Sequence, residues 1–260
     1  MTDKGGLGRL PKDRFESAII ILACAVAVYM LVSVFYLYVA VGESWNLVVS
    51  ALFDNRVLGA IAVSVSSAFI VGSLAIAAAI PTAYLLTYGD FRGKGMLETF
   101  LIDLPQTFPP VTEGLVYLLM LGRIGLAYTY VAVIIAKFYV SAPFAISFAA
   151  RRFREIRESG LDMIARSLGA KTRHVLGRIL LPLSSRDLLA GFSLTWARAM
   201  GELAATLVFA GAVPWRTETI PTIVYLTAAA TPQVAIAASV IAETLSIAAL
   251  LSFRWIAGRR

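Results

Sequence analysis

The residues of this chain that could do chemistry are few, and they form no catalytic group. The run Gly-Ala-Lys-Thr at residues 169–172 is the nearest approach to a phosphate-binding loop. It lacks the glycine directly before the lysine and the upstream glycine of that motif. The serines at 184–185 have no neighbouring histidine and acid, and one histidine (His174) with one cysteine (Cys24) leaves no metal cluster to propose. The sequence therefore predicts a chain that is not an enzyme and binds no metal or cofactor itself.

Charged side chains inside apolar runs are the remaining functional candidates, because such residues are costly in lipid and usually face a pathway or a partner. Arg198 and Glu202 are spaced i, i+4 in one such run, about 15 Å along a helix from its start. Two compatible interpretations are open: an internal ion pair, or a part of the gate or translocation path. The other charges at depth are Glu113, Lys137 and Glu243. The sequence leaves open whether that lysine pairs with one of these carboxylates.

A proline-rich run, Leu-Pro-Gln-Thr-Phe-Pro-Pro at residues 104–110, precedes a short apolar stretch. Proline removes a backbone donor and disfavours helix in the residue before it, so Pro109 and Pro110 predict a break. Broken backbone at membrane depth is tolerated only where it is buried in protein or lines a cavity. The run is therefore either a constriction or gate near Glu113, or a simple bend in a short span.

These residues lie in a chain whose composition is that of an integral membrane protein. Of its 260 residues 59% are hydrophobic and 15% are charged, and the mean hydropathy is +0.79; a soluble domain carries about 25% charged residues. Long apolar runs predict an all-α membrane protein with six transmembrane helices and no separate soluble domain. The expected spans are residues 17–41, 57–88, 111–121 (with 104–110 contributing), 127–149, 188–209 and 233–253.

Lysine and arginine placement predicts the orientation of these spans. With both termini in the cytoplasm, the cytoplasmic segments hold 18 of the 23 basic residues and the outer loops hold 3. The net charge of +7 then follows from topology, and no solvated basic domain for nucleic acid is present. We therefore expect a multi-pass protein of the plasma (inner) membrane that contacts lipid and no nucleic acid.

The one long polar and basic segment, residues 151–185, lies between the fourth and fifth spans. Leu161, Ile164 and Leu168 recur at helical spacing, and Gly169 follows where glycine commonly ends a helix. A second helical run, residues 172–181, stops at Pro182. Such a helix–glycine–helix element predicts a docking surface for a soluble cytoplasmic partner rather than a simple connector.

This segment resembles the signature loop of permease subunits of ABC importers. The family pattern is Glu-Ala-Ala, three residues, Gly, nine residues, Ile, any residue, Leu-Pro. Gly169, Ile179 and residues 181–182 match at the right spacing, and Ala165 matches the second alanine. Met163 and the isoleucine after it replace the usual Glu-Ala, and an aspartate lies one residue early. Residues 101–125 and 188–221, above all the run Trp-Ala-Arg-Ala-Met-Gly-Glu, look like permeases for molybdate, tungstate and sulfate.

The resemblance implies a type I ABC importer fold, with 1–260 forming one permease domain that contains the 151–185 coupling loop. It implies a homodimer, two ATPase subunits that hold ATP and Mg²⁺, and an extracytoplasmic oxyanion-binding protein that meets residues 211–231. The coupling helix would dock on the ATPase through Asp162, Met163, Ala165, Arg166, Ser167, Leu168, Gly169 and Ala170. The expected path or gate residues are Pro109, Pro110, Glu113, Arg198 and Glu202.

Two other classes of protein compete with this reading. An ion-driven secondary transporter often carries an inverted repeat, and the sequence shows none. A membrane-embedded enzyme needs a reactive constellation, which is missing. Within the ABC class, a sulfate or thiosulfate permease is the alternative to a molybdate or tungstate permease, because these anions share shape and charge.

Overall fold

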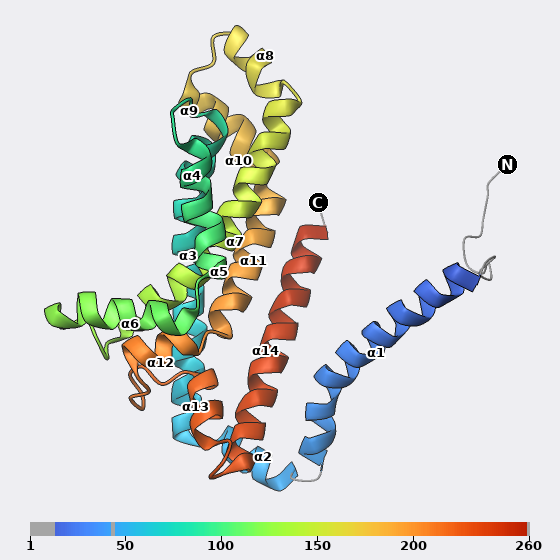
Figure 1. The fold of residues 1–260 in the computed structure, drawn as a ribbon, viewed down its shortest axis with the longest axis vertical. Helices are drawn as coiled ribbons and strands as arrows, with labels where there is room; N and C mark the ends of the chain where they lie inside the picture. Colours follow the sequence, from blue (N-terminus) through green and yellow to red (C-terminus); the bar gives the residue numbers. More distant parts are fainter. Residues whose placement is uncertain (1–13, 43–44, 259–260) are drawn as a thin grey trace. The chain divides into compact units, whose positions relative to one another are not determined.

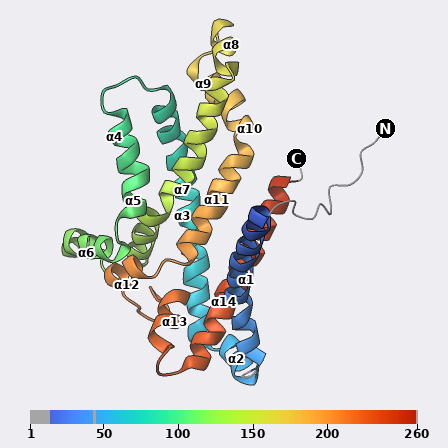
Figure 2. The same cartoon turned by 45° about the vertical axis from the view of Figure 1, so that its right-hand side comes forward.

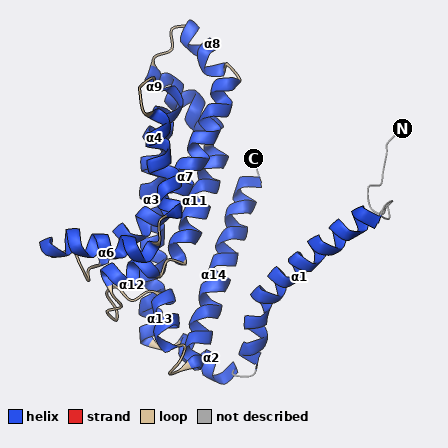
Figure 3. Cartoon of the chain, in the orientation of Figure 1, coloured by secondary structure: helices blue, strands red, loops and turns tan. Residues whose placement is uncertain are grey.

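The computed structural model describes residues 14–42 and 45–258, and all regular structure in these two ranges is helical (Figure 3). The chain forms two compact units, Met1–Asn46 and Leu47–Arg260. The first contains α1 (Arg14–Gly42), which is apolar on every side and exposes large side chains such as Ile21 and Tyr29 along its length. A helix that is apolar all round belongs in a membrane or a large core. The short helix α2 (Trp45–Leu52) follows.

The centre of the second unit is three long helices that run side by side in both views (Figures 1 and 2): α3 (Asn55–Tyr88), α7 (Tyr130–Glu158) and α11 (Ser185–Met200). Asp54 caps α3, its carboxylate accepting the backbone N–H of Arg56 at 2.7 Å. The buried face of α3 is made mostly of small residues, which let neighbouring helices approach closely. These small buried residues include Gly59, Ala60, Ser64, Ser67, Ala68, Gly72, Ala75, Ala79 and Ala83.

The predicted third span is a bent segment rather than one helix. The elements α4 (Lys94–Glu98), the π-helix η1 (Thr99–Asp103) and α5 (Leu104–Thr107) follow one another without interruption. Phe108 then takes an extended conformation and α6 (Pro110–Leu121) turns aside (Figure 1). The break therefore lies at residues 108–109, whereas the first half of the proline-rich run is helical. The wider turn of η1 lies just before Pro105, whose missing N–H would interrupt a regular ladder.

The predicted fifth span, residues 188–209, is also broken, so the expectation of one continuous helix there is wrong. Helix α11 ends at Met200, residues 201–203 are not helical, and α12 (Ala204–Ala210) resumes at an angle (Figure 1). The reason is local: a carboxylate oxygen of Glu202 accepts the backbone N–H of Ala205 at 2.9 Å and so replaces a helical partner. The short α13 (Ile220–Thr227) and the long α14 (Pro232–Gly258) complete the unit.

Four helices among the described residues are long and apolar enough to cross a membrane: α1, α3, α7 and α14. The other two predicted spans are the two broken segments just described. The prediction of an all-α membrane protein is confirmed for the residues that the structure describes. Helix α7 extends beyond its predicted end at residue 149 to Glu158, so the first eight residues of the 151–185 segment continue that helix.

Candidate coupling and translocation sites

The segment predicted as a coupling loop forms a short helix held between two glycines at the end of the three-helix core (Figure 1). Helix α8 (Leu161–Ser167) starts after Gly160 (φ +75°) and ends before Gly169 (φ +85°). The Gly169 N–H donates to the Arg166 carbonyl at 2.9 Å and the Ala170 N–H to the Ala165 carbonyl at 3.0 Å. This pattern is a Schellman motif, in which the left-handed residue is usually glycine. The predicted helix and its glycine stop are therefore confirmed.

Helix α8 and the residue after it expose large apolar side chains to the surface of the protein. Leu168 is 84% exposed, Met163 68% and Ile164 60%. Among the other predicted docking residues, Arg166, Ser167 and Gly169 are exposed and Ala165 and Ala170 are half-buried. Asp162 alone is buried. Exposed apolar groups in one place mark an interaction surface.

The inner side of α8 is fastened to the end of α3 by two tyrosines. Arg166 donates to the Tyr84 hydroxyl at 3.0 Å, and the rings of Tyr84 and Tyr88 stack with centroids 4.9 Å apart. The guanidinium groups of Arg157 and Arg166 lie over the Tyr88 ring, 5.5 and 5.6 Å from its centroid. The buried carboxylate of Asp162 interacts with the same tyrosine. We call this group of Tyr84, Tyr88, Arg157, Asp162 and Arg166 the inner clasp.

Arg198 and Glu202 form the predicted ion pair, with Nη1 and Oε2 2.9 Å apart. Glu202 is 2% exposed, and its second carboxylate oxygen holds the Ala205 N–H at the break between α11 and α12. The ammonium of Lys137, fully buried on α7, donates to the Ser67 hydroxyl at 2.9 Å and interacts electrostatically with Glu202. Glu202 therefore forms an ion pair with Arg198, acts electrostatically on Lys137 and fixes a helix break. The direct hydrogen-bond partner of Lys137 is therefore Ser67, and Glu202 is the carboxylate that acts on it electrostatically.

The two broken spans meet each other. A Cβ on Gly114 would lie 2.8 Å from the Ala205 carbonyl, so α6 and α12 touch backbone to backbone. Glu113, one residue earlier, is 7% exposed and interacts with Tyr117. Pro109 is exposed and Pro110 half-buried at the start of α6. The structure thus brings the proline break and the Glu202 break into contact.

Glu243 lies apart from these charges. It lines a cavity of about 650 Å³ that includes Ser239 and Ser246 of α14, residues of α13 such as Tyr225, and Gly201 beside the α11 break.

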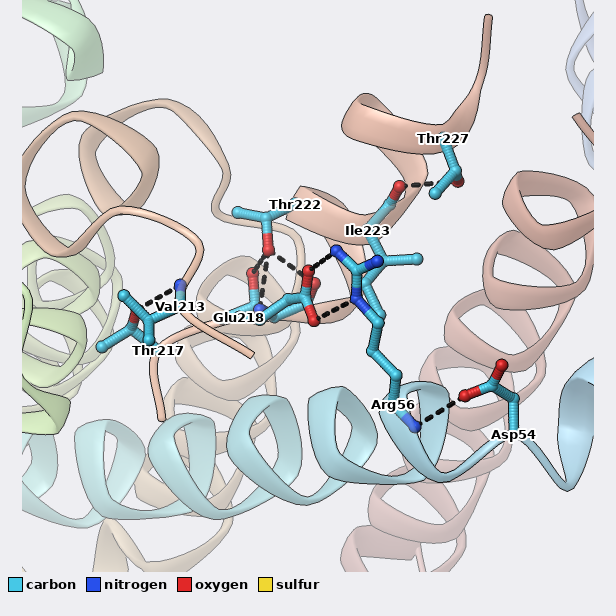
Figure 4. Close-up of polar contacts among 9 residues, drawn as sticks. Asp54, Arg56, Val213, Thr217, Glu218, Thr222, Ile223 and Thr227 are labelled. Atoms are coloured by element: carbon cyan, nitrogen blue, oxygen red, sulfur yellow. Dashed lines mark hydrogen bonds and ion pairs between the residues drawn. The ribbon is translucent and has the colours of Figure 1, made fainter. Parts of the chain in front are cut away.

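Sequence reasoning missed the ion pair whose carboxylate is the most deeply buried (Figure 4). It also missed the more exposed pairs that Glu98, Glu155 and Asp187 form with arginines. The carboxylate of Glu218 is fully buried and accepts two hydrogen bonds from Arg56, at 2.8 Å from Nε and 2.6 Å from Nη2. This fork-to-fork geometry is the strong form of an arginine–carboxylate pair. Nothing in the sequence marks Glu218 as buried, because it lies in a polar stretch, Arg-Thr-Glu-Thr, between apolar runs.

Comparison with known proteins places these features in a family. Residues 79–260 match the family model described as binding-protein-dependent transport system inner membrane component. The chain belongs to this family. It is a permease of the ABC importer class, a transport subunit and not a catalytic one. The matched region contains α8, the inner clasp and the Arg198–Glu202 pair.

Three curated relatives are similar over most of their length. A probable molybdenum ABC transporter permease of Haloferax volcanii is 32% identical, covering 79% of this chain and 78% of that protein. The molybdate/tungstate transport system permease WtpB of Thermococcus kodakarensis is 28% identical, covering 89% of this chain and 92% of that protein. The molybdenum transport system permease ModB of Escherichia coli K12 is 32% identical, covering 72% and 89%.

The fold of this permease matches that of a solved transporter. An inward-facing structure of the MetNI methionine ABC transporter contains a chain with a TM-score of 0.62 and 19% sequence identity, covering 77% of this chain and 94% of that one. The type I ABC importer fold expected from the sequence is therefore confirmed.

Proposed function

We propose that this permease forms the translocation pathway of an ABC importer for a tetrahedral oxyanion, molybdate or tungstate. The observation that supports this mechanism most strongly is helix α8. It exposes apolar side chains, lies between two glycines in the left-handed conformation, and contacts the end of α3. The molybdate and tungstate permeases among the relatives support molybdate or tungstate over sulfate and thiosulfate. No observation favours an ion-driven secondary transporter.

The assembly that follows has two copies of this chain in the cytoplasmic membrane, with the pathway between them. Two ATPase subunits, which bind ATP and Mg²⁺, dock on residues 151–185 at the cytoplasmic face. A binding protein outside the membrane delivers the anion to residues 211–231, at the opposite end of the three-helix core (Figure 1). Both termini then lie in the cytoplasm, as the 18-to-3 split of basic residues favours.

The docking surface is tested by putting a charge on its most exposed apolar residue. Leu168→Glu is expected to abolish co-purification of the ATPase, because a carboxylate desolvated in an apolar interface has no partner. Leu168 is 84% exposed, so the permease itself should stay folded. Ile124→Glu, a matched change at a residue that is 69% exposed in the turn after α6, should leave co-purification unchanged. Equal recovery of the ATPase with both variants would show that α8 is not its docking site.

A further inference from the structure

The segment 213–220, which ends at the first residue of α13, is fastened to the first turns of α3 at three points. Glu218 holds Arg56 through two hydrogen bonds (Figure 4). The indole of Trp215 covers Gly59 so closely that a Cβ there would lie 2.7 Å from the ring. The Ile220 N–H donates to the buried hydroxyl of Ser64 at 2.8 Å. We call residues 213–220 the outer strap.

The outer strap is a rigid turn. The carbonyl of Val213 accepts the backbone N–H groups of Arg216, Thr217 and Glu218 at 2.9 to 3.1 Å, and the Val213 N–H donates to the Thr217 hydroxyl at 3.0 Å. Thr219 and Thr222 then form a capping box that starts α13. These internal hydrogen bonds hold the turn together, and the bonds to Arg56 and Ser64 fasten it to α3.

Trp215 has a strained backbone conformation and an exposed side chain. Its φ is +66°, a left-handed conformation that a bulky residue rarely adopts, and the side chain is still 59% exposed. Such strain persists only where surrounding contacts over-determine it, and it gathers at functional positions. An exposed tryptophan on a rigid turn is also the kind of residue that anchors a protein interface.

The other end of the same helix carries the inner clasp. Tyr84 and Tyr88 of the last turns of α3 hold Arg166 and Asp162 of α8. Between the strap and the clasp, α3 stays helical over 34 residues, about 50 Å at the rise of an α-helix, with Pro81 just before the clasp. Small side chains along its buried face pack α3 closely against α7 and α11.

We infer that α3 transmits movement between the two docking surfaces of this permease, residues 213–220 at one end and α8 at the other. Arg56 and Glu218 are the positioning residues that fasten the outer strap to α3. A binding protein seated on the strap displaces α3 along or about its axis, and the inner clasp passes that displacement to α8 and the ATPase. This inference rests on the proposed function, since it needs both partners. It goes beyond that function by naming the element and the residues that connect them.

The test uses the whole transporter in lipid vesicles, with the molybdate-loaded binding protein as the probe. Basal ATP hydrolysis, hydrolysis at saturating binding protein and the Kd of the binding protein are measured separately. Glu218→Gln is expected to keep ATPase assembly and basal hydrolysis while stimulation at saturation falls about fivefold or more, the lower range of allosteric coupling. Arg56→Lys, which keeps the charge and loses the fork, should retain part of the stimulation. If the Glu218 variant does not fold, the Arg56 variant alone decides.

A double variant tests whether the outer strap and the inner clasp act in the same route of coupling between the binding protein and the ATPase. Tyr88→Leu should also reduce stimulation, and adding Glu218→Gln to it should cause no further loss. Effects at sites this far apart otherwise multiply, because distant mutations are independent. Arg123→Gln, which removes a charge from the exposed turn η2 (Gly122–Ile124), is the control and should be stimulated normally.

Three results would overturn the inference: multiplied losses in the double variant, undiminished stimulation in both Glu218→Gln and Arg56→Lys, or a weaker Kd with full stimulation at saturation. The last would make the strap a docking contact only. Failure of the proposed function looks different, because the unmodified permease would then assemble with no ATPase or show no stimulation at all.

Discussion

Glu202→Leu is expected to destabilise this permease by about 3–5 kcal/mol, the range for removing one partner of a buried charge pair. The loss leaves the cations of Arg198 and Lys137 without their shared carboxylate, and it frees the Ala205 N–H at the break between α11 and α12. Arg198→Leu should be milder, because Glu202 then keeps both the lysine and the amide. Thermal unfolding of the two purified variants in the same detergent measures the difference.

The balance of buried charges also predicts which combinations of substitutions should recover the thermal stability of the permease. Replacing Arg198 and Glu202 together still leaves Lys137 buried without a carboxylate, so recovery should require Lys137→Met as a third change. Glu243→Leu is the matched control, because no ion pair is formed by Glu243 within the described residues. Equal thermal stability of Glu202→Leu, Arg198→Leu and the parent permease would mean that no such buried network exists.

Gly169→Val should abolish ATP-driven transport while the protein still inserts into the membrane. Gly169 has φ +85°, where a β-branched residue is strained, although a Cβ would meet no atom within 4 Å. The substitution therefore acts on the turn after α8 and not on packing. Gly169→Pro should reduce transport at least as much, because proline cannot adopt this φ. Proline also lacks the N–H that donates to the Arg166 carbonyl. Uptake by vesicles that hold the full transporter is the measurement.

Gly177→Ala is the control for this glycine. Gly177 lies in the next helical turns with equally open space around it, and its φ is not left-handed. Normal uptake by Gly177→Ala and none by Gly169→Val would localise the requirement to the turn. Normal uptake and ATPase recovery with Gly169→Val would remove α8 from the coupling mechanism.

The fold was predictable from sequence where hydrophobicity decides it. The apolar runs at residues 17–41 and 57–88 correspond to α1 and α3 within a few residues, because burial in lipid depends on composition alone. The break at residues 201–203 was not predictable, since the run there reads as helical throughout. The break exists because the Glu202 carboxylate accepts the Ala205 N–H in place of a backbone carbonyl. Helix propensities of the residues in this run do not predict such a side-chain hydrogen bond.

The candidate coupling and translocation residues could be predicted where their separation along the sequence is the signal. Gly169 has a fixed distance to the Leu-Pro pair at 181–182, and Arg198 is one helical turn from Glu202, so both features could be read from the chain. The Lys137–Ser67 hydrogen bond and the Arg56–Glu218 pair join residues that are 70 and 162 positions apart. No periodicity within one segment encodes such contacts, because packing between helices creates them.

The most direct measurement of the transport function is ATP-dependent uptake of labelled molybdate by vesicles that contain this permease, its ATPase and the loaded binding protein. We predict uptake that requires all three components and ATP, competition by tungstate, and little competition by sulfate. The permease alone should neither hydrolyse ATP nor move the anion. Uptake by the lone permease along an ion gradient would contradict the ABC mechanism, and full competition by sulfate would contradict the substrate.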